Sequence, residues 1–288
     1  MSSLDRITNL LVLVLLIEMM LSAGLRVSWS DLAGVFRNAS LLARAAVANY
    51  IVVPAVVILL LHLFPAKPLV AIGFLLVGVC PAAPFAPAPT AIARGNVPVS
   101  VGLMVILAGS SAFLAPLLLS FSLPLVAHGA DLKIDTSKIV TTLLMTQILP
   151  LGIGIIVHSK RPRNAERLRK PSNVLGALLS LAVVALIVTG QSRTLTEIRG
   201  SAFVGINLLL LVCLAGGWIL GGKESGIRNS VGLTTAARNV GVALVIATAS
   251  FPDTAAVTAV MLVAIFQTVL LLLFAVWMGR FLLPWRPS

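Results

Sequence analysis

The sequence has little charge. Asp, Glu, Lys and Arg make up 10% of its 288 residues, whereas about 25% is usual for a soluble domain. Hydrophobic residues reach 59%, and the mean hydropathy is +1.07. This composition excludes an ordinary water-soluble domain. A chain that must satisfy its backbone polar groups in lipid forms helices or a closed barrel, and the long, continuous apolar runs favour helices.

Residues that build disulfide frameworks, metal sites and nucleic-acid interfaces are also scarce. The two cysteines, Cys80 and Cys213, lie in separate apolar runs and form no CxxC motif, so a disulfide framework is not supported. His62, His128 and His158 stand near the ends of predicted helices, so no metal site and no cofactor is predicted. The net charge is +12, but there is one Tyr. We therefore assign the positive charge to cytoplasmic loops beside anionic lipid, and not to nucleic-acid binding.

Nine apolar segments approach the roughly 20 residues that a helix needs to cross a bilayer. They are Ile7–Leu25, Ser40–Leu63, Pro68–Ala93, Val97–Val126, Lys138–His158, Asn173–Gly190, Gly200–Gly221, Ile227–Ser250 and Thr254–Leu283. The predicted fold is an all-α polytopic membrane protein, with residues 1–288 in a single transporter domain. The polar stretch Ser159–Asn173 is the expected boundary between a first, truncated repeat (1–126) and a second repeat (138–288).

Lysine and arginine are unevenly divided between the two sides of these segments. Of the 21 Lys and Arg residues, 14 fall on one side, 6 fall on the other, and Arg238 lies inside a segment. Because cytoplasmic loops carry the excess of positive charge, we expect the C-terminus inside and the N-terminus outside. The short loops and small size fit a bacterial inner membrane. With no small-residue cleavage site before Gly24, the first segment is expected to be a membrane helix and not a removed signal peptide.

The third segment is interrupted by prolines. Pro81, Pro84, Pro87 and Pro89 fall within GVCPAAPFAPAPTAIARGN. Each proline removes a backbone donor and clashes with the preceding turn, and lipid does not tolerate the freed carbonyl groups. The segment is therefore predicted to be buried in protein or to line a wet cavity. A kinked structural helix without a ligand is the alternative.

The eighth segment carries polar residues near its centre. Thr234, Thr235, Arg238 and Asn239 fall within VGLTTAARNVGVALVIATAS. A charge at that depth usually faces a cavity or a partner, and Arg238 is about ten residues from either end, too far to snorkel easily. One interrupted helix in each half is typical of inverted-repeat transporters, in which half-helix ends meet at mid-membrane and face the substrate.

Two further polar residues lie deep in apolar segments. Glu18 is the carboxylate placed well inside one of them, and two interpretations stay open: a structural pair with Arg238, or a group that carries a proton. Asn49, ahead of Pro54, is expected to face the protein interior. An enzyme is not predicted, because it would need a nucleophile with a base, or a metal, at this depth.

At the two interruptions the sequence resembles the bile acid:sodium symporter family. The resemblance rests on the Cys80–Pro81 step, ARGN at 93–96, Ser100, the Ala115–Pro116 step, MLSAGLRVSWSDL near the start and VGLTTAARNVGVALVIATASF at 231–251. It implies a panel made of the first, fifth and sixth helices and a core made of the other six, in which the third and eighth helices cross at their breaks. It also implies that substrate lies between panel and core, with sodium behind the crossing.

The sequence departs from the family pattern where that family binds sodium. A Ser-Asn pair after the first break is replaced by Ala86 and Pro87, and a Glu and a Gln four residues apart are replaced by Thr234 and Arg238. The other positions of this degenerate sodium site are the retained Ser100, Met104 in place of Thr, and Asn49 in place of Gln. Because a fixed guanidinium repels sodium, we expect sodium coupling to be lost or severely weakened. Arg238 is expected to hold the crossing together and to favour anions.

The predicted function is secondary transport of a small organic anion. The residues expected to bind it are Arg238, Asn239, Thr234, Thr235, Pro84, Pro87, Asn49 and Glu18. The alternatives are a proton-coupled or uncoupled carrier, efflux of an inorganic oxyanion, and a non-transporting membrane sensor. The expected partners are the anion, the lipid bilayer and a coupling ion, for which a proton is favoured over sodium.

Overall fold

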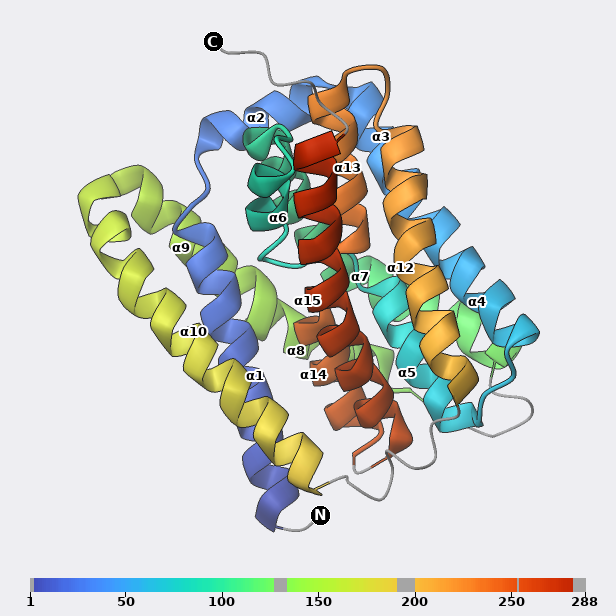
Figure 1. Cartoon of the computed structure of the whole chain (residues 1–288). Coiled ribbons are helices and arrows are strands. Elements are labelled where there is room, and N and C mark those ends of the chain that lie inside the picture. The colour runs from blue at the N-terminus through green and yellow to red at the C-terminus, as the bar shows by residue number, and fades with distance from the viewer. Residues whose placement is uncertain (1–2, 127–133, 191–199, 253, 282–288) are drawn as a thin grey trace.

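The computed structural model describes residues 3–126, 134–190, 200–252 and 254–281, and the regular elements of these residues are all helices (Figure 1). In chain order they are α1 (Ser3–Gly24), α2 (Trp29–Arg37), α3 (Ala39–Val47), the π-helical turn η1 (Ala48–Val52), α4 (Val53–Leu63), α5 (Pro68–Val79), α6 (Pro87–Ile92), α7 (Val97–Val126), α8 (Thr136–Leu143), the π-helical turn η2 (Leu144–Ile148), α9 (Leu149–Lys160), α10 (Pro162–Gly190), α12 (Gly200–Leu220), α13 (Ser225–Ala236), α14 (Val240–Ser250) and α15 (Ala255–Phe281).

Seven helical stretches of the described residues are long and apolar enough to cross a membrane. They are Arg6–Gly24, Ala39–Leu63, Val97–Val126, Thr136–Lys160, Ala202–Leu220, Ser225–Ser250 and Ala255–Arg280. The apolar helix Pro68–Val79 is shorter. The prediction of an all-α protein with several membrane-spanning helices is therefore confirmed.

The expected boundary between the two halves, Ser159–Asn173, lies largely within helix α10. The helix begins at Pro162 and runs through Pro171 to Gly190, so most of the stretch Ser159–Asn173 is helical. Proline suits the first position of a helix, and the Ala, Glu, Leu, Arg and Lys that follow it are good helix formers. The 29 residues of α10 extend over about 44 Å, which exceeds the roughly 30 Å of the hydrocarbon layer. The charged first half can therefore be helical and still lie beyond the apolar layer.

Two π-helical turns lie where the sequence predicts regular helix. Pro54 follows η1 and Pro150 follows η2. Because a proline cannot donate the hydrogen bond of a regular turn, the chain widens ahead of it into a π turn, a feature that is frequent at functional sites. Each turn carries an amide side chain that is 0% exposed, Asn49 in η1 and Gln147 in η2.

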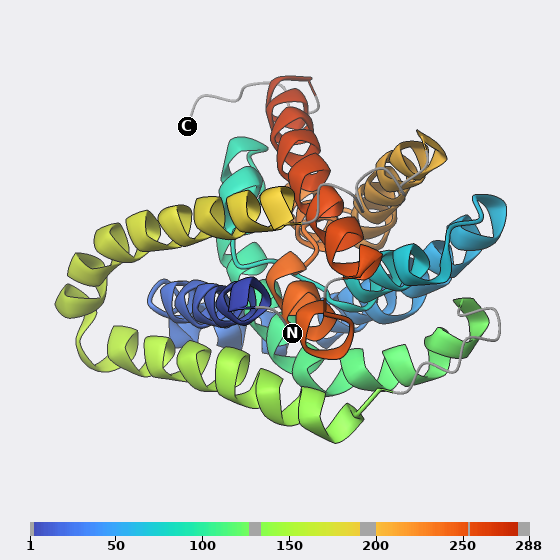
Figure 2. The ribbon, with the colours of Figure 1, turned by 90° about the horizontal axis from the view of Figure 1, so that it is seen from below.

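The helices form two groups, which we call the panel (α1, α8, η2, α9 and α10) and the core (α3–α7 and α12–α15). Seen from below, α1 lies between α10 and α9 (Figure 2). Within the core, α5 packs on α7 and α15, and α12 packs on α13. Helix α1 also packs against α14, so α14 forms part of the seam between panel and core.

A short helix that the sequence did not predict, α2, connects panel to core. Ser28 and Asp31 form a capping box at its start, in which each side chain accepts a hydrogen bond from the other residue's N–H group. Val35 packs on Gly102 of α7, where an added Cβ would lie 2.5 Å from the valine side chain. This close packing fixes the connection against the core.

Candidate functional site

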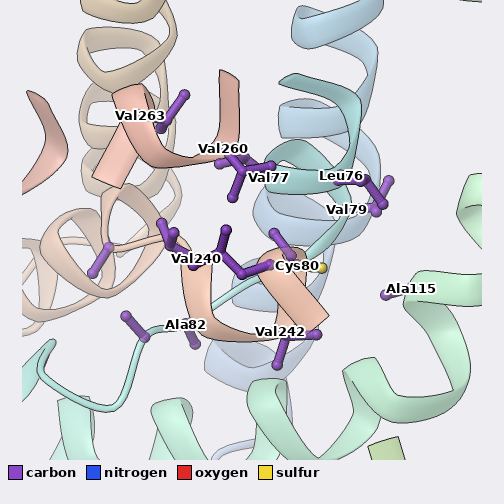
Figure 3. Packing of buried hydrophobic residues seen from close by; sticks show 14 of the residues in the cluster. Leu76, Val77, Val79, Cys80, Ala82, Ala115, Val240, Val242, Val260 and Val263 are labelled. Atoms are coloured by element: carbon purple, nitrogen blue, oxygen red, sulfur yellow. The ribbon is translucent and has the colours of Figure 1, made fainter. Parts of the chain in front are cut away.

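The two interrupted helices meet at their breaks. Residues 80–86 separate α5 from α6, and residues 237–239 separate α13 from α14. The Ala83 N–H donates to the Ala237 carbonyl at 2.7 Å, and the Asn239 N–H donates to the Cys80 carbonyl at 2.9 Å. These two bonds satisfy backbone groups that the breaks release away from water. Small apolar side chains from both helices and from α15 gather around the contact (Figure 3).

Backbone strain is present in the first break. Ala82 has a φ of 55°, in the left-handed region that non-glycine residues seldom adopt. Residues held in this region cost about 1–3 kcal/mol and persist only where the surrounding structure fixes them. Here Ala82 is 0% exposed, and the bonds of its neighbours to the second break hold the strained turn in place.

Arg238 lies at the centre of this contact and is 0% exposed. Its guanidinium donates to the Gly78 carbonyl and to Asn49 Oδ1, both at 2.7 Å, and to the Val77 carbonyl at 3.2 Å. These acceptors are neutral oxygens. The two carbonyls belong to the last turn of α5, where the helix dipole places partial negative charge. The local geometry therefore binds a cation through helix ends and an amide, without a carboxylate.

Two amide side chains support Arg238. Gln267 of α15 accepts a bond from the Arg238 N–H at 2.8 Å and donates one to the Arg238 carbonyl at 3.0 Å. Asn49 accepts from the guanidinium and donates to Thr235 Oγ1 at 3.0 Å. The sequence singles out Asn49 and Thr235 for this site but not Gln267, because an isolated Gln in an apolar helix is more often a simple interhelical partner.

The remaining positions of the degenerate sodium site form a chain of hydroxyl groups. Ser100 Oγ lies 2.8 Å from Thr234 Oγ1 and 3.1 Å from Thr90 Oγ1, and Thr90 Oγ1 donates to the Ala86 carbonyl at 2.9 Å. All four residues are buried. Thr90, two residues before the end of α6, is the member that the sequence did not identify. The hydroxyls bond to one another and to a carbonyl, which satisfies these buried polar groups.

Asn239 is the N-cap residue of α14, just before the helix that packs against α1 at the seam between panel and core. Its Oδ1 accepts from the Val242 N–H at 3.3 Å and caps the helix. Its Nδ2 is buried, and among the described residues it has no hydrogen-bond partner. Gly241, two residues further along, faces Leu16 and Met19 of α1, since an added Cβ would lie 3.3 Å from Leu16. A buried amide donor without a partner is costly. The Nδ2 group is therefore a candidate donor to a bound ligand.

A cleft lies on the panel–core seam beside the first break. Its walls come from α1 and α10 of the panel and from Pro84 and Phe85 of the core, and it contains about 570 Å³ of empty space including its open mouth. Its lining residues are Glu18, Met19, Ser22, Ala23, Arg26, Pro84, Phe85, Asn173, Gly176 and Ser180. We call it the Glu18 cleft.

Polar groups of the panel line the Glu18 cleft. The Ser172 hydroxyl donates to Glu18 Oε1 at 2.6 Å, and Arg26 donates to Asn173 Oδ1. At the mouth, burial and the neighbouring Arg169 guanidinium lower the pKa of Arg26. Two like charges that face each other in this way make the mouth electropositive, which attracts anions.

A second cleft lies on the same seam toward the other end of the bundle. Asp135, Lys138, Ile139 and Thr142 line it from the panel, and Val245, Ile246, Ala249 and Ser250 of α14 line it from the core. Asp135 caps α8 by accepting from the Lys138 N–H, and this bond lowers the pKa of its carboxyl group. The seam is thus hollowed toward both ends, and α1 packs on α14 between the two clefts.

The residues predicted from sequence therefore fall into three places. Arg238, Asn49 and Thr235 form one hydrogen-bonded cluster, and Thr234 joins the hydroxyl chain with Ser100. Met104 is buried, and Pro87 begins α6. Pro84 and Glu18 line the Glu18 cleft from opposite walls. Of the two interpretations of Glu18, the pair with Arg238 is not the arrangement found, because Ser172 binds the carboxylate and neutral oxygens surround the guanidinium.

Comparison with known proteins identifies a family whose model matches this chain. A model of the Sodium Bile acid symporter family matches residues 13–198. The probable sodium/metabolite cotransporter BASS2, chloroplastic, of Oryza sativa subsp. japonica is 24% identical over 216 residues, which cover 75% of this chain and 50% of the rice protein. The match thus spans half the length of that relative.

The matches to two other relatives cover a larger share of the relative's length. The hepatic sodium/bile acid cotransporter of Homo sapiens is 26% identical over 260 residues, 86% of this chain and 72% of the human protein. The uncharacterized protein YbaS of Bacillus subtilis (strain 168) is 25% identical over 228 residues, 76% of this chain and 72% of the bacterial protein.

Proposed function

The chain belongs to the Sodium Bile acid symporter family, whose members are transporters and not enzymes, and we propose that it carries small organic anions across the membrane without coupling to sodium. Two of the relatives named above are a probable sodium/metabolite cotransporter and a sodium/bile acid cotransporter. At the crossing of the two broken helices, this chain carries Arg238 where the family pattern described above has Gln.

The buried guanidinium of Arg238 is the observation that carries this proposal. It is bound by the terminal carbonyls of α5, by Asn49 and, at 3.3 Å, by the Thr235 carbonyl of α13. Oxygen atoms of this kind are the ligands of hard cations. A tethered cation that fills this position cannot leave during a transport cycle, and its charge repels a second cation. The crossing therefore keeps its positive charge without binding an ion.

The preference for anions follows from the groups that face the seam. Asn239 Nδ2, which has no hydrogen-bond partner in the part of the chain that the structure describes, lies at the positive end of the α14 dipole. The Glu18 cleft opens beside Arg26, which has Arg169 as its neighbour. In this scheme the anion enters past the two arginines and accepts a bond from Asn239, with Pro84 on the core wall. Thr234, Thr235, Asn49 and Pro87 act indirectly, by holding the two breaks in register.

The proposal includes a definite architecture. To the seven long spans we add the broken pair α5–α6 and the apolar half of α10, which gives nine crossings in a panel and a core with inverted repeats at 1–126 and 138–288. The excess of Lys and Arg supports a cytoplasmic position for the Glu18 cleft in a bacterial inner membrane, with the N-terminus outside. Clefts toward both ends of the seam suit alternating access, in which the panel rocks against the core.

A thermal-stability screen tests this function. The purified protein is melted with acetate, succinate, benzoate or cholate, in sodium buffer and in choline buffer. A ligand that binds the folded state raises the melting temperature by mass action. We expect at least one carboxylate to stabilise the protein equally in both buffers. Stabilisation that requires sodium would restore an ordinary sodium symporter.

Exchange of two side chains should restore a sodium response. In the double variant Thr234→Glu/Arg238→Gln the fixed cation is removed and a carboxylate is placed beside the hydroxyls of Ser100 and Thr90, which recreates the Glu and Gln spacing of the resembling family. We expect sodium chloride to raise the melting temperature of the double variant above its value in choline chloride, while the wild type melts equally in both salts.

The single variant Thr234→Glu is the matched control for this exchange. Thr234→Glu alone should not respond to sodium, because Arg238 remains near enough to neutralise the new carboxylate. If the double variant folds and also ignores sodium, the position of Arg238 is not a latent cation site.

A further inference from the structure

Helix α1 carries a carboxylate at the panel–core seam that the crossing does not use. Among the described residues of the seven spans, Glu18 is the sole Asp or Glu. The residue is 8% exposed, and what remains exposed faces the Glu18 cleft. An ionisable side chain at this depth costs free energy and usually marks a functional site. We therefore expect a function that a neutral side chain could not perform.

The panel is shaped to hold this carboxylate. Ser172 of α10 donates to Oε1 at 2.6 Å. One turn further along α10 is Gly176, where an added Cβ would lie 2.4 Å from Glu18 Oε2. Any larger residue at 176 would displace the acid. Both contacts lie within the panel, so they would travel with Glu18 when panel and core move.

The charged groups near Glu18 leave its ionisation free to change. Arg26, just beyond the end of α1, is the charged group that acts on Glu18. Arg169 of α10 acts on Arg26 in turn, and His158 of α9 is 3.4 Å from Arg169. The other two elements packed on α1, η2 and α14, contain no Asp, Glu, His, Lys or Arg. Across the cleft the core presents Pro84 and Phe85. Arg26 can balance the ionised acid while the cleft is open, but closure of the core brings an apolar wall against it.

We propose that Glu18 is the proton site of this carrier, and that a proton bound there crosses the membrane together with the substrate anion. The inference rests on the proposed function, in which Arg238 has replaced the dissociable cation at the crossing. A carrier whose core cation is tethered has no ion there to couple, and the group on the moving seam that can still bind and release a charge is Glu18.

Electrostatic repulsion provides the coupling. At an effective dielectric constant of about 20, two negative charges about 6 Å apart disfavour each other by roughly a hundredfold in equilibrium constant. A substrate anion in the Glu18 cleft and an ionised Glu18 would meet this penalty as the cleft closes. Uptake of one proton from water by a Glu18 oxygen removes it, and the proton is released to water on the other side when the seam reopens. One monoanion then moves with one proton, without net charge transfer.

Infrared difference spectroscopy tests the proton site without any substrate. The protein is reconstituted in lipid vesicles and titrated from alkaline to acid pH, and the carbonyl band of protonated carboxylic acids is followed. We expect a component of this band to be present in the wild type, to be absent in Glu18→Gln and to persist in Glu166→Gln, whose carboxylate is exposed on α10. An unchanged band in Glu18→Gln would show that Glu18 does not titrate and would overturn the proposal.

Transport assays test the coupling. The carboxylate that stabilises the wild type most in the thermal screen serves as the probe, in vesicles of wild type, Glu18→Gln and Glu166→Gln. We expect an inward proton gradient to drive accumulation of the probe by wild type and Glu166→Gln, and not by Glu18→Gln. Wild type and Glu166→Gln should also exchange labelled for unlabelled probe at equal pH, and a melting temperature close to that of the wild type shows that Glu18→Gln is folded.

The outcomes separate this inference from the function on which it rests. Proton-driven accumulation that survives in Glu18→Gln overturns the assignment of the proton site but leaves the anion carrier in place. A Glu18→Gln protein that melts with the wild type but is no longer stabilised by the probe overturns it too, because Glu18 then serves binding and not coupling. If the wild type neither binds nor exchanges any carboxylate, the proposed function fails, and the infrared result still decides whether Glu18 titrates.

Discussion

Arg238→Met should lower the apparent melting temperature of the protein by about 10 °C, which corresponds to a loss of about 3–5 kcal/mol for removal of one member of a buried charged cluster. Two opposing contributions decide whether this substitution stabilises or destabilises the protein. Methionine relieves the cost of burying a guanidinium, but it leaves the carbonyls of Val77 and Gly78 and the Asn49 amide oxygen without their donor. Because these acceptors are buried at a helix end that water does not reach, the loss outweighs the relief.

The measurement is a melting curve of the purified protein, followed by intrinsic tryptophan fluorescence. Arg167→Met, on the exposed face of α10, is the matched control and should melt with the wild type, since an exposed arginine contributes little. Arg238→Lys should fall between the two, because an ammonium reaches fewer of the acceptors than the guanidinium fork. If Arg238→Met melts with the wild type, the guanidinium does not hold the two breaks together.

The breaks themselves can be predicted from the sequence because their causes are local. Four prolines in one segment forbid a regular helix whatever surrounds them, and a guanidinium in the middle of an apolar run must find acceptors. The same reasoning selects Asn49 and Thr235, which the structure joins to Arg238. Polar side chains in an apolar sequence are few, so those that occur deep in it tend to find one another.

The main partners of Arg238 could not be predicted in this way. The carbonyls of Val77 and Gly78 are 161 and 160 residues from Arg238 along the chain, and every residue has a carbonyl, so no side chain marks the two that become acceptors. The tethered-cation arrangement follows from where α5 ends relative to α13. That placement is a property of the whole packing and is absent from any one segment.

Elements at the membrane surface also escaped prediction, for a different reason. Hydropathy finds segments that must be buried, but α2 and the first half of α10 are helices with exposed polar faces. Their signals are a capping box and a proline at the first position, which are weaker than a long apolar run. For the π-helical turns η1 and η2, the local signal in the sequence is the proline that follows each turn.

Gly154→Ala should cost about 2–3 kcal/mol, because the added methyl meets backbone that cannot move aside. Its Cβ would lie 2.5 Å from the Leu21 carbonyl oxygen and 2.8 Å from Gly24 Cα, so α1 and α9 would have to separate. Close approach through small residues is how membrane helices gain packing contacts. Gly152→Ala is the matched control on the same helix, since nothing lies within 4 Å of its added Cβ. That control should be neutral or slightly stabilising.

The double variant Gly24→Ala/Gly154→Ala makes the test sharper. Gly24→Ala alone should cost as much as Gly154→Ala, because its Cβ would lie 2.3 Å from the Leu151 carbonyl oxygen in the same contact. Once the helices have moved apart for one methyl, the second meets a gap already opened, so the double variant should lose less than the sum of the single losses. Melting curves of the four variants measure this coupling. Losses that simply add would mean that the two glycines act at separate contacts, and that α1 is not seated on α9 through them.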